Sequence, residues 1–406
     1  MSSYRLYLLI SGWGSFAGRT AFTLNLIYQA TVVGLSPLQL VLVGTLMETV
    51  CFVAQVPTGV IADLISRRLS VIIGYLLMGA GLLVWGLFPS FTAILIANVI
   101  WSVGAVCVDG AEQAWAADEI GDDRATRAFV RGGQIGQAGA LLGIVAATGL
   151  AVFGLAVPIV AGGVLTLALG VLLAFVMTEE RWSPTATEER TTWRSMRRQV
   201  VSGGRAVRRG GMLAGIVAGT LFAGMSSEGF DRLSQPFLLP FLGGAPTELV
   251  FGALTMVAAV GSIVVTGVAG RRLDALHPQR TGRVLALLEG LTAVGMIWFG
   301  RTGRLGLAVA LYLLVRLLRD GAGPILTVWL VSATEPGSRA TVFSIQAQAD
   351  ALGQIVGGPP VGLVGQKRSI GAGISAAGLF LLPAIGLFAL AARRSPVRGD
   401  PQPVSG

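Results

Sequence analysis

The sequence is short of charge, histidine and cysteine, and each shortage excludes a class of protein. Charged residues make up 13% of the 406 positions and hydrophobic residues 53%, which leaves too little polar surface to cover a soluble globule. Cys51 and Cys107 lie in apolar stretches without the spacing of a metal site or a disulfide. The only histidine, His277, lies beside a proline in a basic stretch. We therefore expect no metal site and no cofactor.

Long apolar runs that contain glycine dominate the chain instead. Mean hydropathy is +0.73, and the 57 glycines lie largely within apolar segments, where small residues let helices pack closely in lipid. A helix needs about 20 residues to cross the hydrocarbon core. The sequence therefore predicts an all-α membrane protein. Its twelve predicted transmembrane helices lie at residues 5–31, 38–62, 69–88, 91–117, 127–149, 156–177, 212–241, 248–270, 283–300, 303–333, 339–364 and 370–392.

The basic residues orient these helices. A net charge of +9 could indicate nucleic-acid binding, but the 30 lysines and arginines lie at the ends of the apolar runs rather than in one patch. With a cytoplasmic amino terminus, twenty-two of them fall on the inner side, four on the outer side and four within spans. The positive-inside rule then places both termini in the cytoplasm of a multi-pass cell-membrane protein. Trp85 and Trp298 fall at outer ends of spans, where we expect them to be interfacial anchors.

One long polar segment divides the predicted spans six and six. This division predicts an N-terminal six-helix bundle at 1–178, a basic cytoplasmic linker at 179–211, a C-terminal six-helix bundle at 212–392 and a cytoplasmic tail at 393–406. The linker is expected either to be solvated or to lie partly on anionic lipid. The two halves also share short sequence matches in the same order, among them 16–18 with 222–224, 109–111 with 320–322, and 124–126 with 339–341. Such a pseudo-twofold repeat is typical of transporters.

A short motif follows the second predicted span. Residues 59–68 read GVIADLISRR. This segment resembles the motif G-x-x-x-D-[RK]-x-G-[RK]-[RK] between spans two and three of the major facilitator superfamily. The matching residues are Gly59, Asp63, Arg67 and Arg68, and positions 64 and 66 depart from the motif. The resemblance, taken with the span count and the repeat, covers the whole chain and implies two six-helix bundles that work by alternating access.

The motif suggests a gating latch. Gly59 would let two helices approach, and the Asp63 carboxylate would be favoured at the amino terminus of a helix in the other half. We expect Asp63, with Arg67 and Arg68, to hold the cytoplasmic ends together in the outward-open state. Asp118 would be a second carboxylate for the arginines. The alternative is that the arginines only fix the topology.

Ionisable residues within the predicted spans are the candidate substrate and coupling residues, because each is costly in the bilayer unless it is paired or hydrated. Acids outnumber bases there, which favours either proton carriers or partners for a cationic substrate. The candidates are Arg19, Glu48, Asp109, Glu112, Glu228, Asp231 and Asp350. We expect Glu48, Asp109 and Glu228 to include the protonation site, with Arg19 acting on one of them. Purely structural interhelical pairing is the alternative for each residue.

Spacing sorts these candidates further. Asp109 and Glu112 are three residues apart, so we expect them to share a helix face, where proximity would favour retention of a proton. Glu228 and Asp231 have the same spacing, and Arg232 lies four residues from Glu228.

Two other features of the spans are expected to be structural at least in part. Arg316 and Asp320 are four residues apart and could neutralise one another, so a structural pair is as good an interpretation as a binding site. Glu289 lies close to the predicted inner interface. We expect its role to be structural.

The sequence thus predicts a secondary active transporter that exports a small amphipathic or drug-like molecule in exchange for protons. We expect a monomer that contacts membrane lipids and binds no nucleic acid. Export rests on the family resemblance, and span five has glycines at 132, 133, 136, 139 and 143 without the proline that antiporters of the superfamily often carry. An importer or uniporter of a small metabolite and a non-transporting receptor are the alternatives. An enzyme is not expected, because neither G-x-S-x-G nor H-E-x-x-H occurs.

Overall fold

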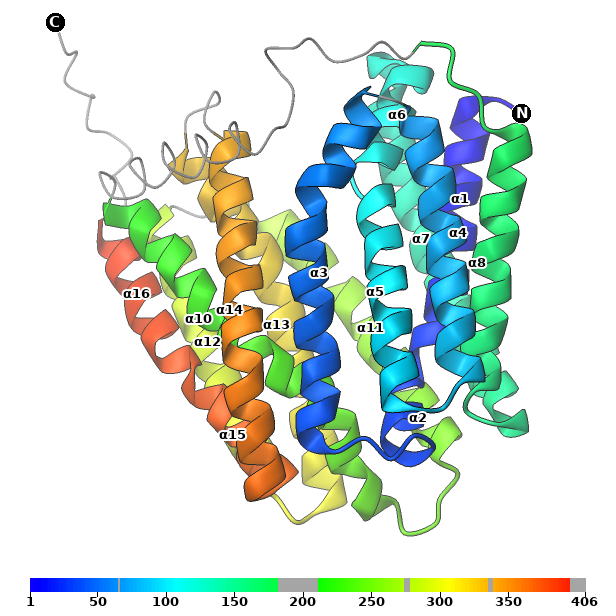
Figure 1. The fold of residues 1–406 in the computed structure, drawn as a ribbon. Coiled ribbons are helices and arrows are strands. Elements are labelled where there is room, and N and C mark those ends of the chain that lie inside the picture. Colours follow the sequence, from blue (N-terminus) through cyan, green and yellow to red (C-terminus); the bar gives the residue numbers. More distant parts are fainter. Residues whose placement is uncertain (65, 182–210, 274–277, 335–338, 395–406) are drawn as a thin grey trace, which may run out of the picture. The chain divides into compact units, whose positions relative to one another are not determined.

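The computed structural model describes residues 1–64, 66–181, 211–273, 278–334 and 339–394. Within these ranges, the side chains of residues 56–57, 59–64, 122–123, 269–273, 278 and 340 are not described. Every regular element in the described ranges is a helix (Figure 1), as expected for a chain that must satisfy its backbone polar groups in lipid. The predicted linker and tail fall mainly on residues 182–210 and 395–406, outside the described residues.

The chain divides into two units, each with its own core. Unit 1 comprises Met1–Met196 with Leu242–Met256, and unit 2 comprises Arg197–Phe241 with Val257–Gly406. The helices of unit 1 are α1 (Ser3–Phe22), α2 (Asn25–Thr31), α3 (Pro37–Leu64), α4 (Arg67–Leu87), α5 (Phe91–Val108), α6 (Ala111–Ile120), α7 (Asp122–Leu150), η1 (Ala151–Phe153), α8 (Val157–Val176) and the first part of α11 (Thr247–Leu273).

Local signals explain several helix ends in unit 1. The hydroxyls of Ser66 and Ser90 accept backbone N–H groups at the starts of α4 and α5, at 3.0 and 3.2 Å, which satisfies donors that the first turn leaves unpaired. Gly121 precedes α7 and Gly154 follows η1, both with positive φ. The chain can reverse at these two points because glycine has no Cβ to clash in that conformation.

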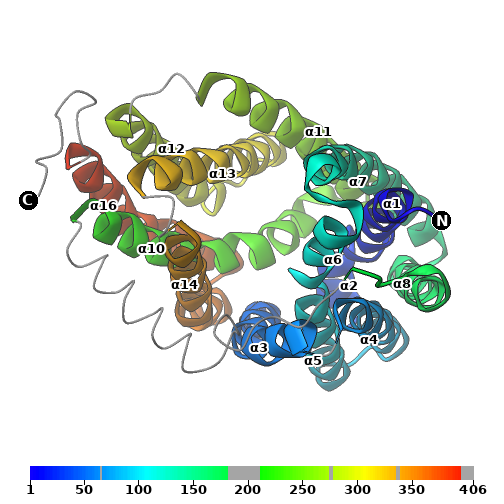
Figure 2. The same ribbon diagram turned by 90° about the horizontal axis from the view of Figure 1, so that it is seen from above.

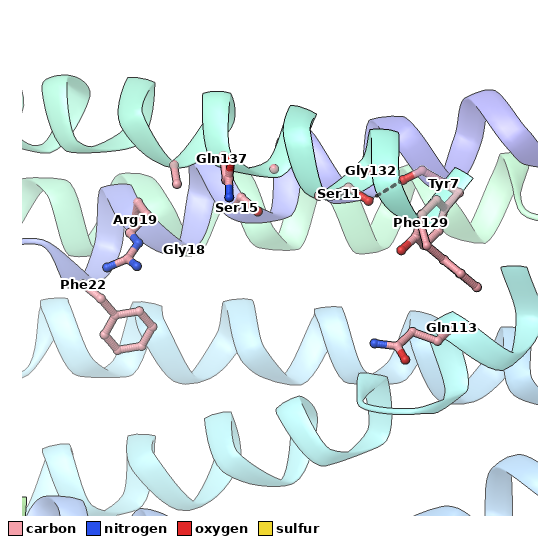
Figure 3. Close-up of a pocket in the computed structure, with 13 residues that line it drawn as sticks. Tyr7, Ser11, Ser15, Gly18, Arg19, Phe22, Gln113, Phe129, Gly132 and Gln137 are labelled. Atoms are coloured by element: carbon pink, nitrogen blue, oxygen red, sulfur yellow. Dashed lines mark hydrogen bonds between the residues drawn. The ribbon is translucent and has the colours of Figure 1, made fainter. Parts of the chain in front are cut away.

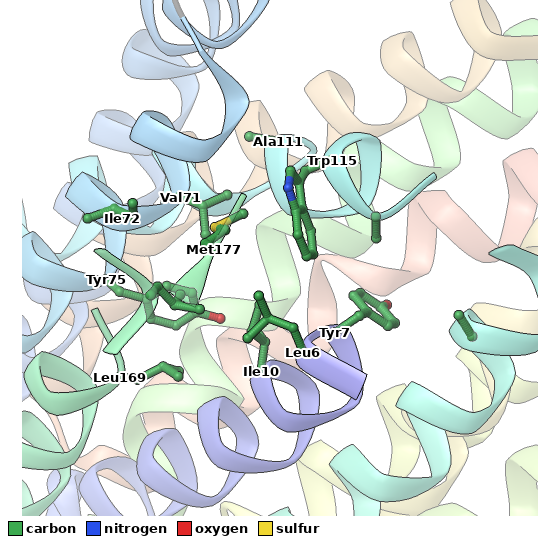
Figure 4. Packing of buried hydrophobic residues seen from close by; sticks show 13 residues of the cluster. Leu6, Tyr7, Ile10, Val71, Ile72, Tyr75, Ala111, Trp115, Leu169 and Met177 are labelled. Carbon is green, nitrogen blue, oxygen red and sulfur yellow. The ribbon is translucent and has the colours of Figure 1, made fainter. Parts of the chain in front are cut away.

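Six long helices of unit 1 pack side by side in an open row. Its order of neighbours is α3, α5, α4, α8, α1 and α7 (Figure 2). The closest approach of α1 and α7 is made by Gly12 and Gly139, where a Cβ on Gly139 would meet the Gly12 carbonyl. Small residues at such a crossing allow the backbones to touch. Above it, the core of unit 1 gathers large side chains from α1, α4, α6 and α8, among them Tyr75 and Trp115 (Figure 4).

Unit 2 is also a helical bundle. Its helices are α10 (Gly211–Leu238), most of η2 (Leu239–Leu242), the second part of α11, α12 (Pro278–Phe299), α13 (Leu305–Ala333), α14 (Arg339–Lys367), α15 (Ile370–Leu379) and α16 (Leu381–Arg393). Helix α10 packs against α14, α15 and α16, and α12 packs against α13, α15 and α16. Trp329 and Phe388, with ring centroids 6.1 Å apart, lie in its core.

Nine helical segments in the described part of the chain are long and apolar enough to cross a membrane. The other three predicted spans, 5–31, 303–333 and 339–364, are helical as well, in α1 with α2, in α13 and in α14. Each of these three contains charged residues, and α13 alone has Arg316, Arg319 and Asp320. The chain is thus a multi-pass helical protein, and the count of twelve spans stays a prediction.

The interfacial role predicted for Trp85 is wrong. Its side chain is 3% exposed and packs edge-on against Phe22, at 6.3 Å between ring centroids. Its carbonyl accepts a hydrogen bond from the Tyr28 hydroxyl at 3.1 Å. Trp298, by contrast, is 62% exposed. Position near the end of an apolar run therefore does not reveal which face of the helix a tryptophan occupies.

Candidate functional site

Unit 1 contains a pocket of about 890 Å³ between α1, α6 and α7 (Figure 3). Residues three or four apart on α1 share one helix face, and this face lines the pocket. Glycines on the facing helix α7 leave the space open. The lining residues are Tyr7, Ser11, Ser15, Gly18, Arg19 and Phe22 on α1, Gln113 on α6, and Phe129, Gly132, Gly133, Gly136, Gln137 and Ala140 on α7.

One cation and several neutral polar groups give this pocket its chemistry. Arg19 is the only charged residue among those that line it in the described structure. The Ser11 hydroxyl donates to the Tyr7 carbonyl at 2.9 Å, and Gln113 and Gln137 add amide groups. Of the seven candidate substrate and coupling residues, only Arg19 lies in this pocket. The pocket can therefore accept a polar or anionic group beside an aromatic wall.

The acids Asp109 and Glu112 flank a break between two helices. Asp109 is the residue that follows the last residue of α5, Val108, and caps its carboxyl end. Gly110 comes next with φ of 76°, and α6 begins at Ala111. The prediction that the two acids share a helix face is therefore wrong, because the apolar run is interrupted between them. Asp109 is exposed. Glu112 lies in the first turn of α6 and accepts a hydrogen bond from the Tyr75 hydroxyl at 2.9 Å, where the helix dipole favours a carboxylate.

The break supplies a stability prediction. Gly110→Ala is expected to lower the free energy of unfolding by about 1 kcal/mol, because a Cβ is unfavourable at positive φ even where, as here, no atom lies within 4 Å of it. Gly133→Ala is the matched control, since its Cβ also meets open space but its backbone is helical. Alanine should stabilise that position. Thermal unfolding of the purified protein in detergent compares the two, and a gain in stability for both would contradict the prediction.

Glu48 lies on α3, the helix that packs against α5. Its side chain is partly exposed. It lines neither of the two pockets described for the units. The structure thus leaves its predicted role in proton coupling as a prediction.

The arginines of the sequence motif tie α4 to its neighbours within unit 1. Arg67 pairs with Asp118 on α6 and donates to the Ala114 carbonyl at 3.2 Å. Arg68 donates to the last carbonyls around the end of α8, at 2.5 Å to Met177 and 2.7 Å to Ala174. The surroundings of Gly59 and the side chain of Asp63 lie outside the described part of the structure. The gating role of the motif stays a prediction.

Glu179 makes contacts at the start of α4 that the sequence analysis did not predict, because this residue lies in the segment predicted to be a linker. Its carboxylate accepts the Ser66 hydroxyl at 2.5 Å and the backbone N–H of Arg68 at 3.0 Å. It therefore satisfies a donor in the first turn of α4, where a carboxylate is favoured. Two adjacent acids, Glu179 and Glu180, soon after the sixth apolar run were the only signal in the sequence.

Unit 2 contains a second cavity, of about 350 Å³, lined by α10, α12, α13, α14 and α16. An ion pair lies at its edge. The guanidinium of Arg319 on α13 donates two hydrogen bonds to the Asp231 carboxylate on α10, at 2.7 and 2.8 Å. The same guanidinium lies 5.4 Å from the centroid of the Phe230 ring. This fork geometry is the strong form of an arginine–carboxylate contact.

Two further carboxylates line this cavity. Asp350 on α14 accepts a hydrogen bond from the side-chain amide of Gln354 at 2.9 Å. Glu289 on α12, to which the sequence analysis gave a structural role, also lies in the wall. Asp231, Glu289 and Asp350 are thus brought together around one cavity, although 119 positions separate the first from the last in the sequence.

The other ionisable candidates of unit 2 form local pairs. Glu228, whose side chain is 3% exposed, pairs with Arg232 at 3.2 Å. Arg316 and Asp320 approach to 3.8 Å. The second contact confirms the pair predicted from the spacing of residues four apart on a helix. Glu228 does not line the described cavity.

The sequence of the chain is similar to a known family of proteins. The family model described as the Major Facilitator Superfamily matches residues 8–358. An uncharacterized MFS-type transporter of Bacillus subtilis (strain 168), YxaM, is 22% identical over 357 residues, which cover 87% of each chain.

Solved transporter structures share the fold. The nucleoside transporter NupG has a TM-score of 0.77 at 12% identity and covers 96% of this chain and 99% of its own. A bacterial homologue of the human lysosomal transporter Spinster has a TM-score of 0.77 at 14% identity, over 97% of this chain and 98% of its own. At these identities the likeness concerns the fold alone. Because the family match extends over most of its length, the chain belongs to the Major Facilitator Superfamily.

Proposed function

We propose that the chain is a secondary active transporter of the cell membrane that exports a small amphipathic or drug-like molecule in exchange for protons. It works by alternating access between two six-helix bundles. Twelve spans are reached when α1 with α2, α13 and α14 are counted beside the nine apolar segments. Both termini then lie in the cytoplasm, the side to which the basic connections belong.

One observation carries the proposal: each unit has a cavity lined by ionisable side chains from membrane-length helices. Arg19 lines the cavity of unit 1, and Asp231, Glu289 and Asp350 line that of unit 2. Charged side chains within membrane-spanning helices are tolerated when they are paired or hydrated, and they usually serve transport. A polar wall in each bundle is what a solute needs to leave water and cross a bilayer.

The known relatives leave the substrate open and support a second candidate function. NupG is a nucleoside transporter, and another solved structure with a TM-score of 0.71 at 15% identity is a peptide transporter, so similar folds carry unlike solutes. The hydroxyl and amide groups of the unit 1 pocket favour import or facilitated diffusion of a small polar metabolite as the alternative. A receptor on the same fold would bind such a solute without moving it.

Proteoliposomes that contain the purified chain test the proposal. An imposed pH gradient is expected to drive movement of an amphipathic dye such as ethidium, and neutralisation of a coupling acid should abolish it. Glu48→Gln, Asp109→Asn and Glu228→Gln are made one at a time. Glu248→Gln, in the first turn of α11, is the matched control. If all three variants keep full pH-driven flux, proton coupling by these three acids is refuted. Equal flux through the unaltered chain with and without a pH gradient favours a uniporter.

A further inference from the structure

The cavity of unit 2 is lined by polar side chains that make no hydrogen bond or ion pair within the described part of the chain. Glu289 on α12 makes no hydrogen bond or ion pair with any described residue. Thr292 lies one turn further along α12, is 2% exposed and is likewise without a hydrogen-bond partner in the described chain. Gln346 on the facing helix α14 adds a third such group. Thr292 is the buried one of the three, whereas Glu289 and Gln346 are half-buried. Because buried polar groups are normally satisfied, the Thr292 hydroxyl beside these two side chains indicates a ligand.

The charge of the cavity is negative. Its carboxylates are Asp231, Glu289 and Asp350, and its one cation among the lining residues is Arg319. Arg319 is already held by two hydrogen bonds to Asp231 and by the face of Phe230. Its guanidinium comes within ion-pair distance of Asp231 and not of Glu289 in the described structure. Arg319 still attracts Glu289 electrostatically, but from beyond ion-pair distance. The Glu289 carboxylate therefore has room for closer contact with a cation from outside the protein.

Part of the cavity lining is apolar. Leu285, Leu326, Leu381 and Phe388 contribute to it. A ligand that fills the space must therefore present an apolar body to these side chains and a hydrogen-bond donor to the polar ones. The described acids do not form a group that could hold a metal ion, which favours an organic cation.

We infer that this cavity binds an amphipathic organic cation, with Glu289 as the partner of its ammonium group. An ammonium has three donors and no acceptor, which suits one carboxylate, the Thr292 hydroxyl and the Gln346 carbonyl. Charge-assisted hydrogen bonds of this kind are about twice as strong as neutral ones. The inference rests on the proposed transport function and names the class of its substrate.

Tryptamine and tryptophol test the inference, because the two compounds share an indole body and differ in an ammonium against a hydroxyl. Isothermal titration of the purified full chain in detergent, at neutral pH, measures both. Tryptamine is expected to bind at least about tenfold more tightly than tryptophol. Glu289→Gln should remove that preference and Glu289→Asp should keep part of it. Glu248→Gln, an acid on α11 that does not line the cavity, should keep all of it.

Equal affinities for the two compounds in the unaltered chain would overturn the inference. So would a preference for tryptamine that survives in Glu289→Gln, since the ammonium would then lie elsewhere. If Glu289→Gln does not fold, Thr292→Val removes a second predicted contact and should weaken tryptamine binding more than tryptophol binding. Ethidium flux separates the two proposals: flux with equal affinities refutes the cation site alone, and selective tryptamine binding without any flux refutes transport alone.

Discussion

Replacing Trp115 with alanine is expected to lower the free energy of unfolding by about 3–5 kcal/mol, the usual cost of emptying a large aromatic site. The side chain is 1% exposed and lies in the core of unit 1 (Figure 4). Its indole N–H also donates to the Thr178 carbonyl at 2.8 Å. Alanine would leave a cavity among α1, α4, α6 and α8 and would strand that carbonyl.

Thermal and denaturant unfolding in detergent measure the loss, and Trp115→Phe separates its two causes. Phenylalanine keeps most of the buried ring but cannot donate a hydrogen bond, so we expect a loss of about 1–2 kcal/mol. Equal losses for the two variants would show that the hydrogen bond to Thr178 matters more than the packing. A loss below about 1 kcal/mol for alanine would contradict the core position of this residue.

The helices themselves, and contacts between residues of the same helix, could be predicted from the sequence. Apolar runs of membrane length predicted the helices, because a chain in lipid has few other ways to satisfy its backbone. The pair of Arg316 with Asp320 followed from spacing alone, because residues four apart on a helix are neighbours. The motif pointed to Arg67 and Asp118, and the structure places these two in contact.

Contacts between distant helices could not be predicted in this way. Asp231 was matched with Glu228 by spacing, whereas its partner is Arg319, 88 positions along the chain. Which faces of α10 and α13 meet is decided by packing, and no periodicity reveals it. Glu289 was given a structural role from its position near the predicted inner interface, and only the packing of the helices shows that it lines the cavity.

The break at Gly110 was missed because glycine is common in membrane helices. The sequence around it is an uninterrupted apolar run up to Asp109, so nothing in the periodicity marks the end of α5. Only the backbone shows that this glycine has positive φ. The shared face predicted for Asp109 and Glu112 failed with it.

Asp231→Asn is expected to destabilise unit 2 by about 2–3 kcal/mol, more than Arg319→Gln, at about 1–2 kcal/mol. The asymmetry follows from the chemistry of the two groups. An arginine in a protein cannot lose its charge, whereas an aspartate left without a partner can take up a proton. With side chains 25% and 37% exposed, Arg319 and Asp231 are partly shielded from water, so the unpaired guanidinium keeps most of its desolvation cost.

The double variant Asp231→Asn/Arg319→Gln decides between an ion pair and two independent polar groups. Without a stranded charge it should be more stable than Asp231→Asn alone, and the coupling between the two sites should exceed about 1 kcal/mol. Unfolding of the four proteins in one detergent completes the cycle. Additive losses would mean that Arg319 finds another carboxylate when Asp231 is gone. Glu289 is one such carboxylate in the same cavity, and the binding of a cation there would then weaken in Asp231→Asn, because the arginine would occupy its site.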